Sequence, residues 1–396
     1  MEDKKLNSDE RKTMAFASTA HALVHSFMLI FPAVLIPIMN EFDLTSTEGG
    51  FLVTFSYLMF GLGALPAGWL TDHFGSRGLI VICMLGSGLS AIFIGYSESY
   101  LELAAGLVLL GAFTSIYHPA GLALISRRIR NRPRALGYHG IFGNIGLAGA
   151  PFVAGIISSI GEWRDAYLLF GLISLIAATY FLIRPVSERT IEDSQRNSEE
   201  VKTKFREVII LFSATVIFGF IYRGTLTFMP YLFTHNVTQW TGIDPIAIGG
   251  SVTAAALLVG TFGQWFGGRV AEKYSLTLIL SIIWAILIPT LLLMGIFEQY
   301  LLIIIAFIFT LVIFASQPVG NTLLAKYISM KSKGKGYGLN IAIGFGIGSF
   351  AAPVCGYIAE KTSAGGVFIF LGLLAPIGLV LSIWLNRIER KKLVTG

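Results

Sequence analysis

Long apolar segments alternate with short polar breaks along almost the whole chain. A helix needs about 20 apolar residues to cross the hydrocarbon core of a bilayer, and the sequence offers twelve such stretches. They cover residues 14–39, 48–70, 78–96, 101–125, 135–160, 166–184, 206–233, 246–268, 276–296, 301–325, 337–360 and 366–386. The pattern predicts an all-α membrane protein with twelve transmembrane helices.

The polar break after the second apolar segment recurs about half a chain later. Residues 68–77 read GWLTDHFGSR, and residues 268–275 read GRVAEKYS. At a constant offset, glycine pairs with glycine, aspartate with glutamate and phenylalanine with tyrosine. A repeat at half the chain length indicates two related halves. We therefore expect pseudo-symmetric six-helix halves over 1–184 and 206–396, joined by a polar cytoplasmic linker over 185–205.

Composition supports a membrane protein and excludes several other classes. The chain is 54% hydrophobic and only 13% charged, whereas a soluble protein carries about 25% charged residues. The net charge of +6 is spread between the apolar segments, so we expect no nucleic-acid partner. Cys83 and Cys355 lie inside apolar segments and predict packing residues. No ATP-binding motif occurs, and we expect neither an enzyme nor a cofactor nor a metal site.

The positions of Lys and Arg predict the orientation in the membrane. If the twelve helices alternate in direction, 26 of the 29 basic residues fall on one side. Arg164 and Lys361 lie on the other side, and Arg223 lies within a helix. Basic loops remain in the cytoplasm, so we expect both termini to be cytoplasmic. The short loops favour a prokaryotic cytoplasmic membrane.

Polar residues within the apolar segments are costly in a bilayer and mark functional positions. They gather in the first, fourth, seventh and tenth segments, whereas the third, sixth, ninth and twelfth carry almost none. The simplest interpretation is four helices around an aqueous cavity and four facing lipid. The candidate substrate-binding or proton-coupling residues are His21, His25, Tyr117, His118, Tyr222, Arg223, Gln317 and Asn321.

Arg223 and the histidines each allow two interpretations. A mid-membrane Arg costs about 2.5–3.5 kcal/mol on insertion scales, so Arg223 either contacts an anionic substrate group or is a structural residue bonded to carbonyls. His21, His25 and His118 can change charge near neutral pH and relay protons. A neutral His hydrogen-bonded between helices accounts equally well for any single one of them. We expect His139 to be mainly structural.

The repeated break resembles the loop 2–3 signature of the major facilitator superfamily, G-x-L-x-D-R-x-G-x-R. The matching residues are Gly68, Leu70, Asp72, Gly75 and Arg77, with His73 at the usual basic position. The resemblance implies a gating role for this loop and for Glu272 in its degenerate second copy. Asp72 is expected to meet the N-terminus of the helix over 337–360, and a solvated loop acid is the alternative.

Two shorter resemblances concern a particular branch of the superfamily and a particular mode of transport. Residues 20–21, 117–121 and 222–224 are similar to the fosmidomycin-resistance branch of that superfamily and its relatives. The segment 135–160 resembles an antiporter signature, with two of its glycines replaced by alanine; the matching residues are Gly137, Gly146, Pro151 and Gly155. The segment 337–360 repeats part of that pattern, so close helix packing is an alternative explanation.

One departure concerns proton coupling. Proton-linked exporters of the superfamily usually carry an Arg in the fourth helix, where this chain has Leu107, and no Asp or Glu lies near the middle of an apolar segment. Coupling through a carboxylate is therefore not supported by the sequence.

The sequence as a whole predicts a secondary active transporter that works by alternating access. The leading expectation is proton-coupled efflux of a small organic anion or amphiphilic drug. The alternatives are an importer or facilitator of a small organic anion, or a non-transporting membrane sensor or scaffold. We expect a monomer whose partners are the substrate, protons and the lipid bilayer.

Overall fold

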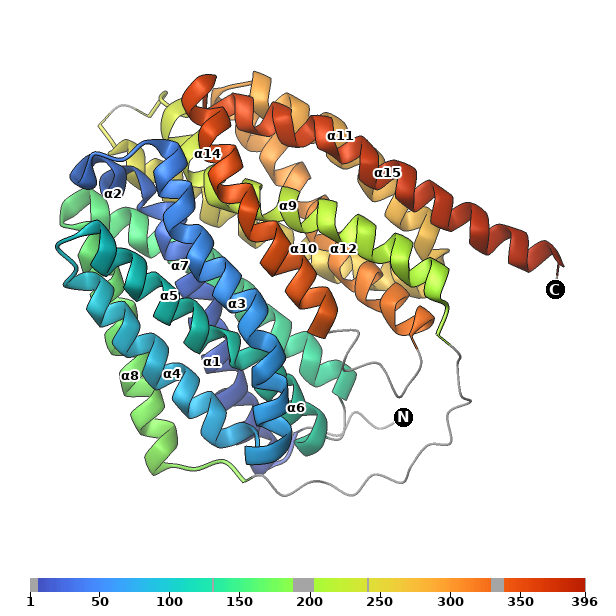
Figure 1. Ribbon diagram of the computed structural model, residues 1–396, viewed down its shortest axis with the longest axis horizontal. Coiled ribbons are helices and arrows are strands. Elements are labelled where there is room, and N and C mark those ends of the chain that lie inside the picture. The colour runs from blue at the N-terminus through green and yellow to red at the C-terminus, as the bar shows by residue number, and fades with distance from the viewer. Residues whose placement is uncertain (1–5, 130–131, 188–202, 241, 329–337, 396) are drawn as a thin grey trace.

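The computed structural model describes residues 6–129, 132–187, 203–240, 242–328 and 338–395. Within these ranges the chain is helical apart from short connections (Figure 1). Twelve helices in the described ranges are long and apolar enough to cross a membrane. The predicted number of transmembrane helices and the all-α class are therefore confirmed.

The helices follow one another as a bundle with few irregular elements. The first part of the chain contains α1 (Ser8–Ala33), α2 (Leu35–Phe42), α3 (Ser46–Phe74), α4 (Ser76–Gly95), α5 (Tyr100–Ser115), α6 (Tyr117–Arg128), α7 (Arg132–Ile160) and α8 (Trp163–Ile183). The second part contains α9 (Phe205–Asn236), α10 (Pro245–Lys273), α11 (Leu276–Ile296), α12 (Gln299–Tyr327), η2 (Ala342–Gly346), η3 (Ile347–Phe350), α14 (Ala351–Lys361) and α15 (Ala364–Thr395).

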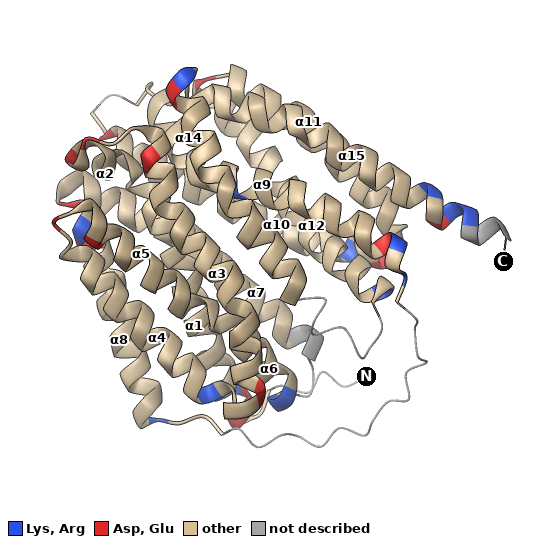
Figure 2. Ribbon diagram, viewed as in Figure 1, with Lys and Arg blue, Asp and Glu red and all other residues tan. Residues whose placement is uncertain are grey.

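Two ends of the bundle can be distinguished. We call the base the end where α1 begins and where α3, α6 and α15 end, and the top the opposite end, where α2 lies (Figure 1). Figure 2 shows that charged residues gather at these two ends, whereas the middles of the helices carry almost none. Such a distribution is expected of helices that cross a hydrocarbon layer.

The helix pairs within the two parts of the chain correspond to one another. In the first part, α3 packs on α5 and α4 on α8; in the second, α10 packs on α12 and α11 on α15. The contacts between the parts also correspond, because α7 packs on α10 and α14 packs on α3. This agrees with two pseudo-symmetric halves, while the boundaries at 184 and 206 stay a prediction. Residues 188–202 of the expected linker lie outside the described residues.

The described contacts between the halves lie at the top and in the centre. At the top, Thr47 donates a hydrogen bond of 2.7 Å to Glu360 of the other half. Nearer the centre, Thr54 donates to the backbone oxygen of Ser349 over 3.3 Å. At the base, a Cβ built on Gly68 would meet no heavy atom within 4 Å. Among the described residues, hydrogen bonds thus join the halves at the top and in the centre.

A polar cluster at the top ties α2 to α8. Arg164 donates two hydrogen bonds of 2.6 Å to the carboxylate of Glu41, and the indole of Trp163 donates a third of the same length. Arg164 also donates to the backbone oxygen of Ser97. The hydrogen bonds from Arg164 lower the pKa of Glu41 below its ordinary value. The cluster therefore holds the end of α2 against the start of α8.

Pro119 and Pro318 lie inside membrane-spanning segments, and one of them coincides with a break in the helix. The segment 101–125 is divided at Ile116, which lies between α5 and α6. Pro119 has no N–H to give to the carbonyl of Ser115, so the helical hydrogen-bond ladder is interrupted there. Pro318 lies inside α12, which runs through it without a break.

An irregular stretch precedes α14 that the sequence pattern did not predict. Residues 342–346 form a π-helical turn and residues 347–350 a 3₁₀ turn. Segments of π-helix inside transmembrane helices often occur at functional sites. In this chain the π-helical turn carries Phe345, which belongs to the site described below.

Candidate functional site

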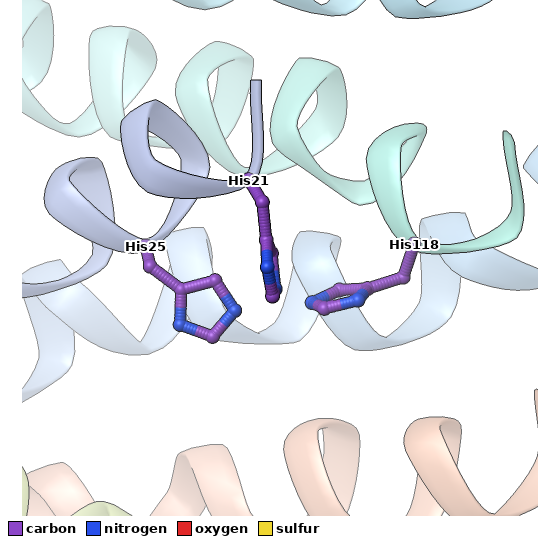
Figure 3. Close-up of side chains that lie close together, drawn as sticks. All are labelled: His21, His25 and His118. Carbon is purple, nitrogen blue, oxygen red and sulfur yellow. The ribbon is translucent and has the colours of Figure 1, made fainter. Parts of the chain in front are cut away.

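Three imidazole rings converge between α1 and α6 (Figure 3). His21 and His25 are one helical turn apart on α1, and His118 approaches from α6. The ring centroids of His21 and His25 lie 4.4 Å apart, and that of His118 lies 5.3 Å from His21 and 5.4 Å from His25. One nitrogen from each ring lies within 4.8 Å of the others. We call these three residues the histidine cluster.

The back of the cluster is fixed by α7. The ring of His139 stacks on that of His21 with centroids 3.9 Å apart, and the backbone oxygen of His139 lies 2.8 Å from His21 Nδ1. Because a carbonyl only accepts, His21 Nδ1 carries the proton. The hydroxyl of Tyr117 donates to the backbone oxygen of Ala17, so Nε2 of His139, at 2.6 Å, donates to that hydroxyl. His139 thus orients His21, consistent with its expected structural role.

The front of the cluster has unpaired nitrogens. His21 Nε2 and both ring nitrogens of His25 are buried and have no hydrogen-bond partner among the described residues. Buried polar atoms are nearly always hydrogen-bonded in native proteins, since an unpaired one is costly. His25 and His118 are partly exposed, whereas His21 is buried. The cluster is therefore arranged to receive a proton, water or ligand from the side of His25 and His118.

Arg223 is almost completely buried, at 1% exposure, in the middle of α9. The ring of Tyr57 lies over its guanidinium carbon at 4.3 Å, and the ring of Phe345 at 4.0 Å. Its Nε and Nη2 have no hydrogen-bond partner in the described part of the chain. We call Arg223, Tyr57 and Phe345 the aromatic clamp. The rings stabilise the buried charge through cation–π interactions.

The aromatic clamp and the histidine cluster adjoin. Arg223 is close enough to His25 and His118 for their charges to interact. Phe60 bridges the two groups, with its ring centroid 5.0 Å from Phe345 and 5.7 Å from His118. The combined site takes its residues from α1, α3 and α6 of the first half and from α9 and η2 of the second. The sequence-predicted residues His21, His25, His118 and Arg223 therefore meet at the interface of the halves.

Gln317 belongs to a second polar group, which also crosses the interface. Its side-chain oxygen accepts a hydrogen bond of 2.9 Å from Gln264, and Gln264 accepts one of 2.6 Å from Asn144 on α7. This chain of amides joins α12 and α10 to the first half. Gln317 thus connects helices in this structure, and its role in substrate binding or proton coupling stays a prediction.

The other predicted lining residues have different surroundings. Tyr117 lies behind the histidine cluster, where it binds His139 and Ala17. Tyr222 is half-buried, and its ring centroid is 6.0 Å from that of Phe314. Asn321 is exposed, one turn nearer the base than Gln317. Their predicted role in substrate binding or proton coupling stays a prediction.

The structure gives Asp72 a partner other than the expected one. Its carboxylate lies 3.2 Å from Nη2 of Arg127 on α6, and both side chains are exposed, at 73% and 40%. The expected contact was with the start of the helix over 337–360. Residues 329–337 lie outside the described residues. Asp72 is thus tied to its own half here, and a contact across the base stays a prediction.

The remaining loop residues fit a tight turn between α3 and α4. Gly75 adopts a φ of 83°, which side-chain-bearing residues rarely reach. Gly68 lies in open space at the end of α3, Arg77 is half-buried and Glu272 is exposed. The glycine of the signature therefore has a clear backbone role, and the gating role of the charged residues is untested.

The glycine-rich face of α7 packs against two helices. A Cβ on Gly146 would lie within 3 Å of backbone atoms of Ala22 on α1. A Cβ on Gly155 would lie 3.1 Å from Cα of Gly250 on α10, and the oxygen of Pro151 approaches the same Gly250. Gly137, at the base, has open space. Close packing therefore accounts for most of the antiporter-like pattern.

Four residues of the site were not singled out by the sequence. Asn144 and Gln264 are amides within apolar segments, so a search for every polar residue in the predicted transmembrane segments would have found them. Tyr57 and Phe345 carried no such signal, because the chain has 14 Tyr and 30 Phe. Their role follows only from the contact of three distant helical segments.

The histidine cluster also bears on metal binding. Zinc bonds of about 2.0–2.1 Å place tetrahedral nitrogens roughly 3.4 Å apart, and the cluster's nitrogens are spread within 4.8 Å. The nearby positive charge of Arg223 opposes a divalent cation. Three imidazole nitrogens within 4.8 Å of one another could still hold a metal ion, so the expectation of no metal site stays a prediction.

Comparison with known proteins identifies the class. A profile of the Major Facilitator Superfamily matches residues 15–353. The chain belongs to this superfamily of membrane transporters, and the sequence-based expectation of that family is confirmed.

Individual relatives are distant but extend over most of the chain. The nitrite extrusion protein of Bacillus subtilis is 24% identical over 94% of both chains. Multidrug resistance protein 1 of the same organism is 26% identical, over 87% of this chain and 89% of the relative. The 4-hydroxybenzoate transporter PcaK of Pseudomonas aeruginosa is 26% identical over 52% of each chain.

Solved structures show the same fold. An inward-facing, occupied bacterial homologue of the human lysosomal transporter Spinster has a TM-score of 0.78 at 15% identity, covering 97% of this chain and 98% of that one. A POT family transporter in complex with 5-aminolevulinic acid has a TM-score of 0.79 at 12% identity, covering 96% of each chain. At these identities, the likeness concerns the fold.

Proposed function

We propose that this chain carries a small organic anion across the membrane, coupled to protons, with the aromatic clamp as the anion site. The observation that carries the proposal is the unpaired edge of Arg223. A buried guanidinium with two free N–H donors in a membrane protein calls for an oxyanion. The aromatic rings provide the cation–π stabilisation but leave the hydrogen-bonding capacity of that edge unused.

The histidine cluster is the proposed proton carrier. No Asp or Glu lies near the middle of an apolar segment, so the groups beside the anion site that can change charge near neutral pH are imidazoles. Three of their nitrogens have no hydrogen-bond partner among the described residues, and His118 and His25 are partly exposed. A proton that enters the cluster therefore lies next to the anion site.

Transport follows from reorientation of the two halves around the site. The contacts between halves at the top and centre, and the open surroundings of Gly68 at the base, support a state that is closed at the top. We propose that the protein resides in a bacterial cytoplasmic membrane as a monomer, with both termini in the cytoplasm. The base then faces the cytoplasm.

The direction of transport has two candidates. The resemblance to antiporters and to the fosmidomycin-resistance branch favours efflux of an anion or amphiphilic drug in exchange for protons. Import, or facilitated passage, of a small organic anion is the second candidate. Relatives carry names of both kinds, including an extrusion protein and a 4-hydroxybenzoate transporter. A sensor or scaffold without transport gives no reason for the unpaired edge of Arg223.

The proposal predicts anion-dependent transport in purified proteoliposomes. With a pH-sensitive dye inside, one class among carboxylates, phosphonates and cationic drugs should trigger a proton flux. Arg223→Gln should reduce that flux at least tenfold, because the neutral amide lacks both the charge and the two-donor edge.

The matched control is His235→Asn. His235 is exposed near the end of α9, and its Nδ1 lies 2.8 Å from the backbone oxygen of Tyr231 one turn earlier. It should transport as the parent chain does. Full transport by Arg223→Gln would remove the aromatic clamp as the anion site.

A further inference from the structure

The geometry points to co-transport: we propose that an oxyanion in the aromatic clamp and a proton on the histidine cluster bind in the same conformation, strengthen each other and cross together. This inference rests on the proposed function and deepens it. It names the ligand as a carboxylate or similar oxyanion with two oxygens on one edge. It also decides the sense of coupling, which the proposed function leaves between exchange and import.

The ligand chemistry follows from which atoms of Arg223 are free. Nε and Nη2 are the unpaired atoms, and their N–H bonds point in parallel from one edge of the guanidinium plane. The rings of Tyr57 and Phe345 lie against the guanidinium carbon at 4.3 and 4.0 Å. Two oxygens side by side on one ligand match the two parallel donors. A cation or a neutral apolar drug has no matching group.

The charges around the histidine cluster decide whether proton and anion cross together or in exchange for each other. The titratable groups that face it come from every surrounding element: His21 and His25 of α1, Tyr57 of α3, Tyr117 and His118 of α6, His139 of α7, and Tyr222 and Arg223 of α9. None of these groups is a carboxylate. A proton on the cluster without a ligand therefore meets the positive charge of Arg223 and no negative charge.

A bound oxyanion supplies the missing negative charge. It pairs with Arg223 and simultaneously attracts a proton to His25 or His118, which lie within reach of the same charge. Coupling between two binding sites is reciprocal, so the proton also strengthens the binding of the anion. Exchange needs the opposite relation, in which substrate and proton displace each other. The site therefore favours proton–anion symport, which under an inward proton gradient means uptake.

Proton uptake on binding tests the inference without any transport assay. Purified full-length protein in detergent, in weakly buffered solution with a pH indicator, is titrated with benzoate, phenylphosphonate and nitrate. We expect at least one of these probes to bind, and up to one proton to enter the protein per bound anion. Proton release would overturn symport in favour of exchange and leave the proposed function standing. Binding without any pH change would show that clamp and cluster are independent, and overturns the inference.

Variants separate the two groups of residues. His118→Gln and, separately, His25→Gln should still bind the anion, though more weakly, and should reduce proton uptake at least threefold; measurable binding shows that the variant is folded. Arg223→Lys keeps the charge but loses the two-donor edge, so we expect at least tenfold weaker binding. His235→Gln, near the end of α9 and bonded only to the backbone oxygen of Tyr231, is the matched histidine control.

Failure of the inference and of the proposed function are distinguishable. If no probe binds the parent chain, the clamp is not an oxyanion site, and the inference is overturned. The proteoliposome experiment, with its wider set of substrates, then decides by itself whether the chain is a coupled transporter.

Discussion

Arg223 shows how a charge is accommodated in an apolar interior without a carboxylate. The rings of Tyr57 and Phe345 lie against its guanidinium carbon, and a desolvated cation–π contact contributes about 2 kcal/mol. The sequence predicted that Arg223 required a partner, because a charge inside an apolar segment is costly. It could not predict Tyr57 and Phe345, which lie far away in the chain and meet Arg223 only through packing of α3, η2 and α9.

The same contact predicts a loss of stability in a clamp variant. Tyr57→Leu removes one ring from the buried guanidinium, so the free energy of unfolding should fall by about 2 kcal/mol. Tyr57→Phe keeps the ring and loses hydroxyl contacts of 3.4 Å and an interaction of the hydroxyl with Arg223, so its loss of stability should be smaller than that of Tyr57→Leu. Thermal unfolding of the detergent-purified proteins measures both. Equal loss in the two variants would mean that the hydroxyl, and not the ring, stabilises Arg223.

At the scale of elements, the hydrophobic pattern predicted the helices well and their interruptions poorly. Every predicted apolar segment corresponds to a helix long enough to span a membrane, because the cost of exposing polar groups to lipid dominates at that length. The break at Ile116 had a local signal in Pro119. The π-helical turn over 342–346 had none, since it depends on how η2 packs against α3 and α9.

The packing of α7 on α1 gives a prediction for a single glycine. Gly146→Val places methyl groups against the backbone of Ala22, and overpacking of this kind costs about 1–3 kcal/mol. Gly149→Val is the matched control on the same helix, because a Cβ there meets no heavy atom within 4 Å. Melting temperatures in detergent should therefore fall for the first variant only. A similar drop in both would indicate loss of helix propensity or flexibility instead of a clash.

At the scale of the whole molecule, the sequence predicted the twelve-helix superfamily fold and the residues of the histidine cluster. The histidine cluster could be predicted because polar residues are conspicuous within apolar segments. The partners at the base were not, because Asp72 near the end of α3 pairs with Arg127 near the end of α6, and the meeting of two helix ends leaves no periodic trace in the sequence. The rings of the aromatic clamp and the hydrogen-bonded amides of Asn144, Gln264 and Gln317 were not predictable either, because they depend on how distant helices pack.

Symport of one proton with one monovalent anion predicts a transport rate that is insensitive to membrane voltage. A single charge crossing the membrane experiences about 2.3 kcal/mol per 100 mV, but the proposed pair carries no net charge. Uptake of a binding anion into proteoliposomes should therefore follow an imposed pH gradient and remain unchanged when a potassium diffusion potential is applied. A rate that changes with voltage at constant pH gradient would contradict one-to-one coupling.

The aromatic clamp is shared between the halves of the protein. Tyr57 belongs to α3, whereas Arg223 and Phe345 belong to α9 and η2. Any reorientation that moves α3 away from α9 removes one wall and admits water to the guanidinium. Hydration would then compete with the bound oxyanion for the same two N–H donors. Unloading of the cargo would accordingly be driven by wetting of the site, with no competing solute required.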